Sequence, residues 1–363
     1  MAALQEVESI AVALDDPRRL GQVLRFLSNQ FCLMGAYDQA IAAAQRTLAL
    51  ATTDGDVVLH ARANDSLGFA YLSQGDYRRA IDCYGQTAAF FDGVRRHERF
   101  GQVMPPAVAS RARLAWGHAE LGTFAEGRAA GEEGLRIAEV MAHPTSLIYA
   151  SWGIGRLFLR QGNLPRALPH LERAVGLCQD ADLPAWFPWV AAALGGAYAL
   201  AGRVADAVPL LTQAMKQTDA TDIGVFNQAL CSLPLSEAQM LASRLEEAQA
   251  FAEHTLALTR THQERGNEAY ALRLLGEIAA RREPPERDQA EAHYRQTLVL
   301  TDELGMRPLQ AHCHLGLGML YAKIGRRAEA RAELSPAIEL YRAMEMTFWL
   351  PQAEAALAEV EGR

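Results

Sequence analysis

The sequence lacks the short motifs that identify several large classes of enzyme. It has no Gly-x-x-x-x-Gly-Lys phosphate loop, no His-Glu-x-x-His metal-binding pattern and no Cys-x-x-Cys pair. Gly153-Ile154-Gly155 has no third glycine and falls inside a predicted helix, so it indicates close packing rather than a dinucleotide loop. Asp and Glu are frequent, but no isolated acidic pair stands in an apolar setting. We therefore expect no catalytic constellation, no bound metal and no cofactor, and hence no enzyme.

Cysteine and long apolar runs are also scarce, and the 35 Lys and Arg are outnumbered by the 43 Asp and Glu. The five Cys are odd in number and widely spaced, which favours a reducing cytoplasm over a disulfide framework. The formal net charge of −8 argues against nucleic acid as the main partner. No charged-then-apolar leader opens the chain, and no apolar run reaches the ~18 residues of a membrane span. A soluble cytoplasmic protein that contacts no membrane is expected.

What the sequence does contain is a helix-turn-helix pattern, seen most clearly in Ala61–Ala88, ARANDSLGFAYLSQGDYRRAIDCYGQTA. Apolar residues within Leu67–Tyr71 share one face at helical spacing, and Gly75 then interrupts the pattern. A second amphipathic stretch begins near Ala80. Because Gly68 and Ala80 have little side-chain bulk, the two helices are expected to cross closely there.

This pattern recurs eight times with a period of about 40 residues. The small residue that opens each second helix recurs as Ala40, Ala80, Gly127, Ala167, Ala207, Ala248, Ala290 and Ala330. An earlier small residue lies in the middle of each first helix: Ser28, Gly68, Ala115, Gly155, Gly195, Ser236, Gly276 and Gly318. The recurrence predicts an all-α fold, an α-solenoid of about eight repeats in which each unit contacts only its neighbours. Pro234 is expected to kink or shorten the first helix of unit six.

The repeats account for nearly all of the chain, so we predict a single solenoid over residues 1–363. Residues 1–16 are interpreted as the leftover helix of a preceding repeat, because they resemble a second helix without its first. Residues 17–345 hold the eight repeats. Residues 346–363 are predicted to form a C-terminal helix that caps the array.

Leu67-Gly68 with Tyr71, followed by Gly75-Asp76-Tyr77 and Ala80, resembles the tetratricopeptide repeat. The period of about 40 residues also fits HEAT and armadillo repeats, but the Gly-x-Tyr turn and the Leu-Gly pair favour the tetratricopeptide repeat. The resemblance implies a right-handed superhelix whose first helices line a concave groove, a surface used for binding proteins.

Longer segments, among them Arg99–Pro106, Leu183–Arg203 and Glu303–Gly318, are similar to the repeat region of one group of bacterial signalling proteins. In that group a class III nucleotide cyclase-like domain and an AAA-type ATPase domain precede the repeats. The wider group of helical sensors, which includes the maltose regulon activator, is also similar. The resemblance implies a regulatory or partner-sensing module.

In the implied register, residues two, five and nine of each first helix face the groove. These candidate partner-binding residues are Arg25, Asn29, Arg62, Asp65, Trp116, Tyr149, Trp152, Arg156, Trp189, Glu237, Tyr270, Arg273 and Glu277, with His312 and Met319 further along. The aromatic stretch of units three to five is the strongest candidate, because flat rings beside a guanidinium suit a peptide. The alternative, that these rings fill gaps between adjacent hairpins, stays open.

Two other binding sites are considered from the sequence. Arg25, Asn29 and Arg113 match part of the carboxylate clamp of chaperone-binding relatives, but Ser66 and Ala109 stand where further clamp residues are required. The second is a basic stretch between units two and three, which suggests either a phosphate site or a solvated loop: Arg95, Arg96, His97 and Arg99.

The function favoured by these observations is a non-enzymatic, regulatory or signalling scaffold that binds a peptide or protein partner in its concave groove. The alternative is the ligand-sensing regulatory region of a larger ATPase- or nucleotide cyclase-type signalling protein. A third hypothesis, an ATPase or cyclase subunit, is disfavoured by the missing phosphate loop. Candidate partners include an ATPase or cyclase domain in cis or in trans, and self-association is left open.

Overall fold

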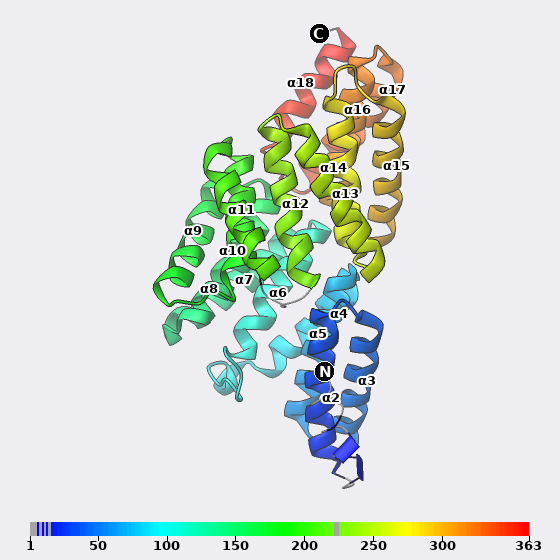
Figure 1. Ribbon diagram of the computed structural model, residues 1–363. Coiled ribbons are helices and arrows are strands. Elements are labelled where there is room, and N and C mark those ends of the chain that lie inside the picture. The colour runs from blue at the N-terminus through cyan, green and yellow to red at the C-terminus, as the bar shows by residue number, and fades with distance from the viewer. Residues whose placement is uncertain (1–5, 7–8, 11, 14–15, 221–224, 363) are drawn as a thin grey trace.

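The described chain is helical throughout (Figure 1). The computed structural model describes residues 6, 9–10, 12–13, 16–220 and 225–362, and these contain seventeen α-helices, one short 3-10 helix and no β-strand. The leftover helix predicted for residues 1–16 lies largely outside the described residues, and its described residues are helical up to residue 13. None of the described helices is long and apolar enough to cross a membrane.

The helices form eight successive antiparallel pairs followed by one further helix, which confirms the predicted α-solenoid. The pairs are α2 (Pro17–Leu33) with α3 (Tyr37–Asp54), α4 (Val57–Gln74) with α5 (Tyr77–Phe90), α6 (Pro106–Leu121) with α7 (Phe124–Met141), α8 (Pro144–Gln161) with α9 (Leu164–Asp180), α10 (Phe187–Leu200) with α11 (Val204–Ala220), α12 (Val225–Leu241) with α13 (Leu245–His262), α14 (Arg265–Arg281) with α15 (Arg287–Leu304), and α16 (Arg307–Lys323) with α17 (Arg327–Ala343). The last helix, α18 (Leu350–Glu361), packs on α16 and α17, and its role as a cap stays a prediction.

The tight turn inside the second pair follows from two residues with special backbone or capping properties. Gly75 ends α4 with φ +92°, a left-handed conformation that favours glycine. Asp76 then begins α5, where its carboxylate accepts the N–H of Arg79 at 3.2 Å. Because one residue ends a helix and the next begins another, the two helices must run antiparallel and close together.

In five of the eight pairs, the small residue in the middle of the first helix is a glycine that leaves room for a large residue of the second helix. A Cβ atom added at Gly68 would lie 2.9 Å from the ring of Tyr84, which follows Ala80 by one helical turn. A Cβ at Gly155 would lie 2.7 Å from Leu171. The same pairing of glycine with a bulky residue holds at Gly195 with Leu211, Gly276 with Tyr294 and Gly318 with Leu334.

Where serine replaces this glycine, the facing residue is small and the hydroxyl bonds to the partner helix instead. Ser28 Oγ donates to the carbonyl of Ala40 at 2.8 Å, and the residue one turn further is Ala44. Ser236 Oγ donates to the carbonyl of Ala248 at 2.6 Å. Seven of the eight pairs therefore use one of these two arrangements, and in the third pair Ala115 faces Gly131 instead.

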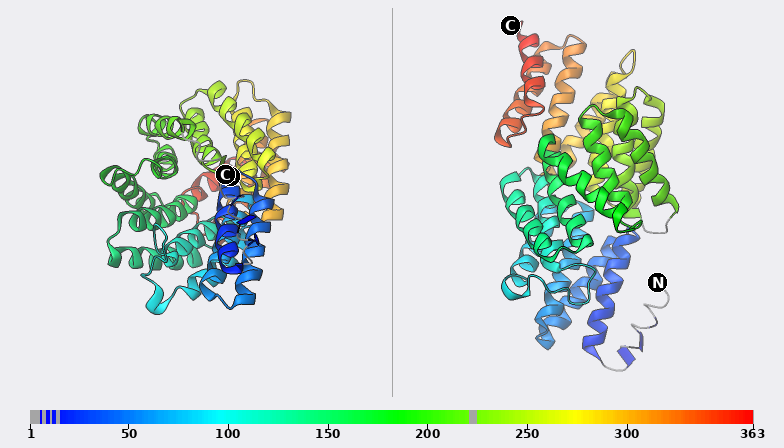
Figure 2. Two further views of the ribbon diagram at one scale, coloured as in Figure 1. Left: turned by 60° about the horizontal axis from the view of Figure 1, so that its bottom comes forward. Right: turned by 90° about the vertical axis from the view of Figure 1, so that its left-hand side faces the viewer.

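The solenoid winds so tightly that successive superhelical turns touch (Figure 2). α2 of the first pair contacts α12 of the sixth, α4 of the second contacts α14 of the seventh, and α6 of the third contacts α16 of the eighth. One superhelical turn therefore takes about five pairs. The prediction that each unit contacts only its neighbours is wrong, because the small rotation between neighbouring pairs brings the chain back onto itself.

Specific side chains form these contacts between turns. Tyr37 donates its hydroxyl to Glu264, which precedes α14, at 2.7 Å. The backbones of Gly75 and Gly266 pack closely together. A Cβ atom added at Gly75 would lie 2.8 Å from the backbone nitrogen of Gly266. The next contact along the turn, between Glu120 and Tyr270, borders the candidate site described below.

Pro234 does not shorten its helix as the sequence led us to expect. α12 runs for seventeen residues through Pro234, as long as α14 and α16. α12 packs against α10, α11 and α13, so tertiary contacts maintain the helix although proline donates no hydrogen bond.

Candidate ligand-binding cavity

A row of aromatic rings crosses the first helices of pairs three, four and five. The centroids of Trp116 and Trp152 lie 5.5 Å apart, and those of Trp152 and Trp189 lie 4.8 Å apart, both edge to face. Tyr149 lies 5.6 Å from Trp189. All four of these residues were candidates for the groove, and the structure brings them into one continuous cluster.

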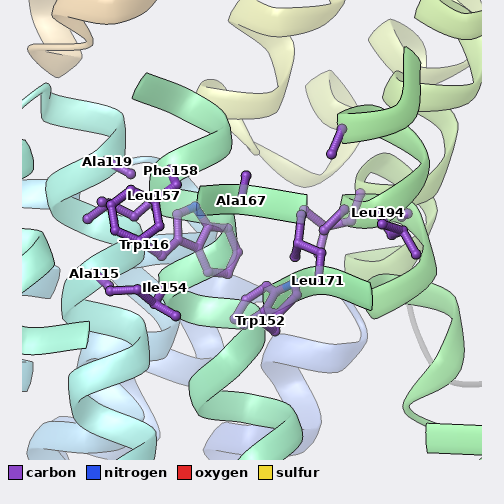
Figure 3. Close-up of a cluster of buried hydrophobic side chains, with 14 of the residues drawn as sticks. Ala115, Trp116, Ala119, Trp152, Ile154, Leu157, Phe158, Ala167, Leu171 and Leu194 are labelled. Atoms are coloured by element: carbon purple, nitrogen blue, oxygen red, sulfur yellow. The ribbon is translucent and has the colours of Figure 1, made fainter. Parts of the chain in front are cut away.

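The two rings at the start of the row are interior. Trp116 is 5% exposed and Trp152 is 2% exposed, and both lie in the hydrophobic core (Figure 3). Their burial agrees with the alternative interpretation, in which rings fill space between adjacent pairs. Tyr149 and Trp189 are half-buried.

Trp189 lines a partly open cavity between the first helices of both superhelical turns. α8, α10, α12, α14 and α16 contribute to its wall, together with Trp349 at the start of α18. Its volume is about 140 Å³, close to the ~150 Å³ of cavities that admit a benzene ring. The predicted residues that line it are Arg156, Trp189, Glu237, Tyr270, Arg273 and His312.

Glu120 lies behind the cavity wall and joins three helices from two turns. The carboxylate is 1% exposed and accepts four hydrogen bonds. Trp116 Nε1, Arg156 Nη2 and Arg160 Nε donate to Oε1 at 3.0, 3.2 and 3.4 Å, and the Tyr270 hydroxyl donates to Oε2 at 2.6 Å. Burial alone would raise the pKa of Glu120, but Arg160, Arg156 and these hydrogen bonds outweigh it, so the pKa is lowered and the group is ionised.

Two guanidinium groups share this single carboxylate. Arg156 lies over the ring of Trp116 at 4.3 Å, and Arg160 lies over the ring of Tyr270 at 4.1 Å. Burial, followed by the charge of Arg160, lowers the pKa of Arg156. Among the described residues, the buried Nε of Arg156 has no hydrogen-bond partner. This side of the cavity therefore has one more positive charge than negative charge.

The opposite side of the cavity is electrically balanced. Arg273 donates to Glu237 at 2.8 Å and to Glu277 at 2.6 Å, and Arg281 donates to Glu277 at 3.0 Å, so two guanidinium groups face two carboxylates. His312 packs edge to face on Trp349 at 4.5 Å. Burial, with Arg273 and Arg160 nearby, lowers the pKa of His312 well below its usual range, so this ring is neutral.

The remaining predicted residues do not line the cavity. Arg113 donates to both carboxylate oxygens of Asp65 at 2.9 and 3.0 Å, and to the Tyr149 hydroxyl at 2.8 Å. Ser66 donates to Asn29 at 3.2 Å. Arg62 donates to the carbonyl of Phe100, and Arg25 is buried. Glu277 bonds Arg273 and Arg281 outside the cavity wall. The clamp candidates Asn29 and Arg113 are thus engaged within the chain.

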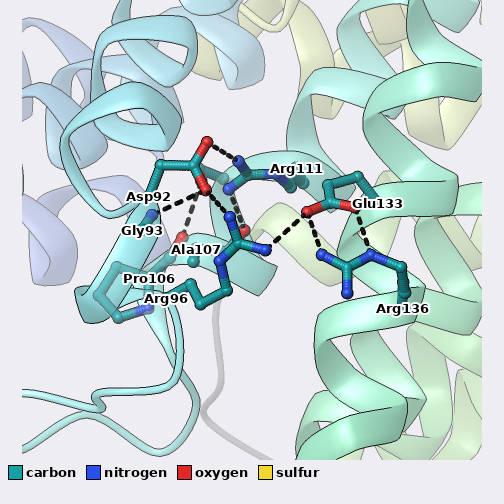
Figure 4. A network of polar contacts seen from close by, with 9 residues as sticks. Asp92, Gly93, Arg96, Pro106, Ala107, Arg111, Glu133 and Arg136 are labelled. Atoms are coloured by element: carbon teal, nitrogen blue, oxygen red, sulfur yellow. Dashed lines mark hydrogen bonds and ion pairs between the residues drawn. The ribbon is translucent and has the colours of Figure 1, made fainter.

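Of the basic stretch between pairs two and three, Arg96 is paired with acidic neighbours (Figure 4). Arg96 pairs with Asp92 at 2.7 Å and with Glu133 at 3.5 Å. Arg111 pairs with the same Asp92 at 3.3 Å, and Arg136 pairs with Glu133 at 2.7 Å. Arg96 is therefore not free to bind a phosphate, whereas Arg95 lies over the ring of Phe90 and Arg99 lies 3.0 Å from the ring of His143. The choice between a phosphate site and a solvated loop stays a prediction.

Sequence reasoning missed Glu120, Arg160 and Trp349. Glu120 and Arg160 each lie one helical turn beyond a predicted residue, Trp116 and Arg156 respectively. The register was applied to positions two, five and nine, and extending it to position thirteen would have found both. No sequence signal places Trp349 here, because the superhelical turn brings it to the cavity.

Comparison with known proteins supports this fold. Residues 19–92, which comprise nearly all of the first two pairs, match the family model described as tetratricopeptide repeat. A comparison with curated protein sequences finds no match.

Three solved structures are similar in fold. The Rap conjugation gene regulator of plasmid pLS20, in complex with the Phr* peptide, has a TM-score of 0.63 and 14% identity over 94% of this chain and 95% of that chain. A Rap protein complexed with Competence and Sporulation Factor has a TM-score of 0.59 and 11% identity over 94% and 97%. Aspartyl phosphate phosphatase F from Bacillus subtilis has a TM-score of 0.54 and 13% identity over 80% and 73%. These low identities establish similarity of fold alone.

Proposed function

We propose that this protein is a non-enzymatic interaction module that binds a peptide segment of a partner in the cavity inside its superhelix, in a regulatory or signalling role. The observation that carries the proposal is the cavity wall, where Trp189 and Trp349 stand beside Arg156 and Arg160. Aromatic rings next to guanidinium groups supply both apolar area and hydrogen-bond donors, the combination found at strong protein-binding sites.

Two further observations support a peptide. The cavity lies between helices of two superhelical turns and has a volume of about 140 Å³, so one side chain or the terminus of a peptide fits it and a folded domain does not. Two solved structures of similar fold are complexes, one with the Phr* peptide and one with Competence and Sporulation Factor. The cytoplasm, which the free cysteines favour, is the compartment we propose for this interaction.

The volume of about 140 Å³ favours a second candidate, recognition of a small metabolite. In that case the chain is the ligand-sensing region of a larger ATPase- or cyclase-type signalling protein. A peptide extends beyond the cavity along the concave face, whereas a metabolite is contained in it.

Binding of a synthetic pentapeptide pool of degenerate sequence to the immobilised full chain tests the proposal. Retained peptides are identified by mass spectrometry. Gly196→Leu places a side chain into the cavity, where a Cβ has only ordinary contacts at 3.7 and 3.8 Å, and we expect it to abolish retention. Gly176→Leu is the matched control, because no atom lies near a Cβ at that helical position outside the cavity. Equal retention by both variants contradicts the proposal, and retention by neither wild type nor variants favours the metabolite.

A further inference from the structure

We propose that the ligand of this cavity carries a carboxylate, which binds between Arg156 and Arg160. This inference rests on the proposed function and specifies the chemistry of the peptide. Its starting point is the charge on one side of the cavity, where two guanidinium groups face the single carboxylate of Glu120.

Glu120 cannot satisfy both arginines. A carboxylate offers about four acceptor positions, and its four partners are Trp116, Arg156, Arg160 and Tyr270. Each guanidinium has five N–H groups, and Arg156 gives Glu120 one hydrogen bond, at 3.2 Å. The donors left over belong to side chains that line the cavity.

The surroundings make this surplus charge costly when the cavity holds no anion. The Arg156 side chain is 11% exposed and the Arg160 side chain is 29% exposed, so water compensates their charge poorly. A buried cation without a counter-ion is unfavourable, and a planar guanidinium is suited to bind a carboxylate through two parallel hydrogen bonds. A carboxylate entering the cavity completes the ion pairing of this wall.

The other walls of the cavity indicate which chemical groups the ligand carries next to its carboxylate. Trp189, Leu230 and Trp349 present apolar surface, and His312 is neutral there. Arg273 is already compensated by Glu237 and Glu277, so it does not compete for the anion. The arrangement fits a peptide with an apolar side chain beside an acidic residue or beside a free C-terminus.

The pentapeptide pool, synthesised once with a free C-terminal carboxylate and once as the amide, distinguishes these two sources. With wild type we expect peptides that carry a carboxylate to be enriched at least tenfold over the input. Enrichment confined to the free-acid pool assigns the C-terminus, and enrichment of Asp or Glu in both pools assigns a side chain.

Arg156→Met removes the surplus charge while Arg160 remains paired with Glu120, and we expect it to reduce the enrichment to about the input ratio. Arg156→Lys keeps a positive charge and should retain part of the enrichment. Arg173→Met is the matched control, an exposed arginine on the outer helix α9 that pairs with Glu139. Circular dichroism verifies that each variant is folded.

The outcomes separate this inference from the proposed function. If wild type retains peptides without preference for a carboxylate, or if Arg156→Met keeps the full enrichment, the carboxylate site is wrong while peptide binding stands. If wild type retains no peptide from either pool, peptide binding is wrong and the inference falls with it.

Discussion

Glu120 links helices that are far apart in the sequence, and replacing it should show whether the two superhelical turns stabilise each other. It accepts hydrogen bonds from α6 itself, from α8 and, through Tyr270, from α14. Glu120→Gln preserves the shape of the side chain but removes its charge. The two partly buried guanidinium groups of Arg156 and Arg160 then lose the carboxylate with which they form ion pairs.

Breaking a buried ion pair by removing one partner costs about 3–5 kcal/mol, and we expect a loss of that size in the free energy of unfolding. Tyr270→Phe is the milder comparison, because it removes one hydrogen bond to a charged group and leaves no charge unpaired, at about 1.5–3 kcal/mol. The pKa of Glu120 is lowered in the folded state. Its contribution is therefore present above the usual carboxyl pKa of 4.5 and is lost as the pH falls through the lower folded value. Glu120→Gln should accordingly lose less stability than wild type on acidification.

Hydrogen exchange followed by mass spectrometry measures this effect helix by helix. In Glu120→Gln we expect faster exchange in α6 and α8, and also in α14, which follows α6 by about 150 residues. Protection of α14 at the wild-type level, with loosening confined to α6 and α8, would show that the contact between turns contributes little. The conclusion that this solenoid is stabilised across its turns would then be refuted.

Three other predictions concern single contacts. Burial raises the pKa of Glu264 to about 7, so its contribution to stability is complete below pH 4.5 and is lost as the pH rises through 7. The free energy of unfolding should change by roughly 3 kcal/mol over this range. Urea unfolding at a series of pH values measures this change, and Glu264→Gln should abolish it. Trp152→Ala should cost ~3–5 kcal/mol because the ring is buried, and a thermal melt close to that of wild type would contradict this placement. Gly68→Leu should cost about 1–3 kcal/mol by overpacking against Tyr84, and Tyr84→Ala in the same chain should recover part of that loss in chemical denaturation.

The helix pairs could be predicted from the sequence because their signals are local. Gly75 ends one helix and Asp76 begins the next, and the structure places the boundary between α4 and α5 at these two residues. The spacing of Gly68 and Ala80 also predicted a close crossing. The sequence did not show that the ring of Tyr84 occupies this space, although the combination of glycine with a bulky residue recurs in four other pairs.

The candidate site could be predicted in part. Six of the fifteen candidate residues line the cavity, and they were found because one helical face repeats every three to four residues. The sequence also predicted the side of the first helices on which Trp116 and Trp152 lie. It did not predict that both rings are buried, because the neighbouring pairs cover them. The periodicity of a helix predicts the direction in which a side chain points from the helix axis. The exposure of that side chain depends on the neighbouring helices that pack against it.

The part of the site that the sequence could not reveal depends on the pitch of the superhelix. Each pair is rotated slightly relative to the one before, by an amount set by many small differences in side-chain volume at the interface. Over five pairs these rotations add up, and their sum decides whether Glu120 reaches Tyr270 or faces solvent. A change of a few degrees per pair would separate α6 from α14 and open the cavity, with every helix and every local contact unchanged. The binding site is therefore a property of the accumulated geometry, which no single repeat contains.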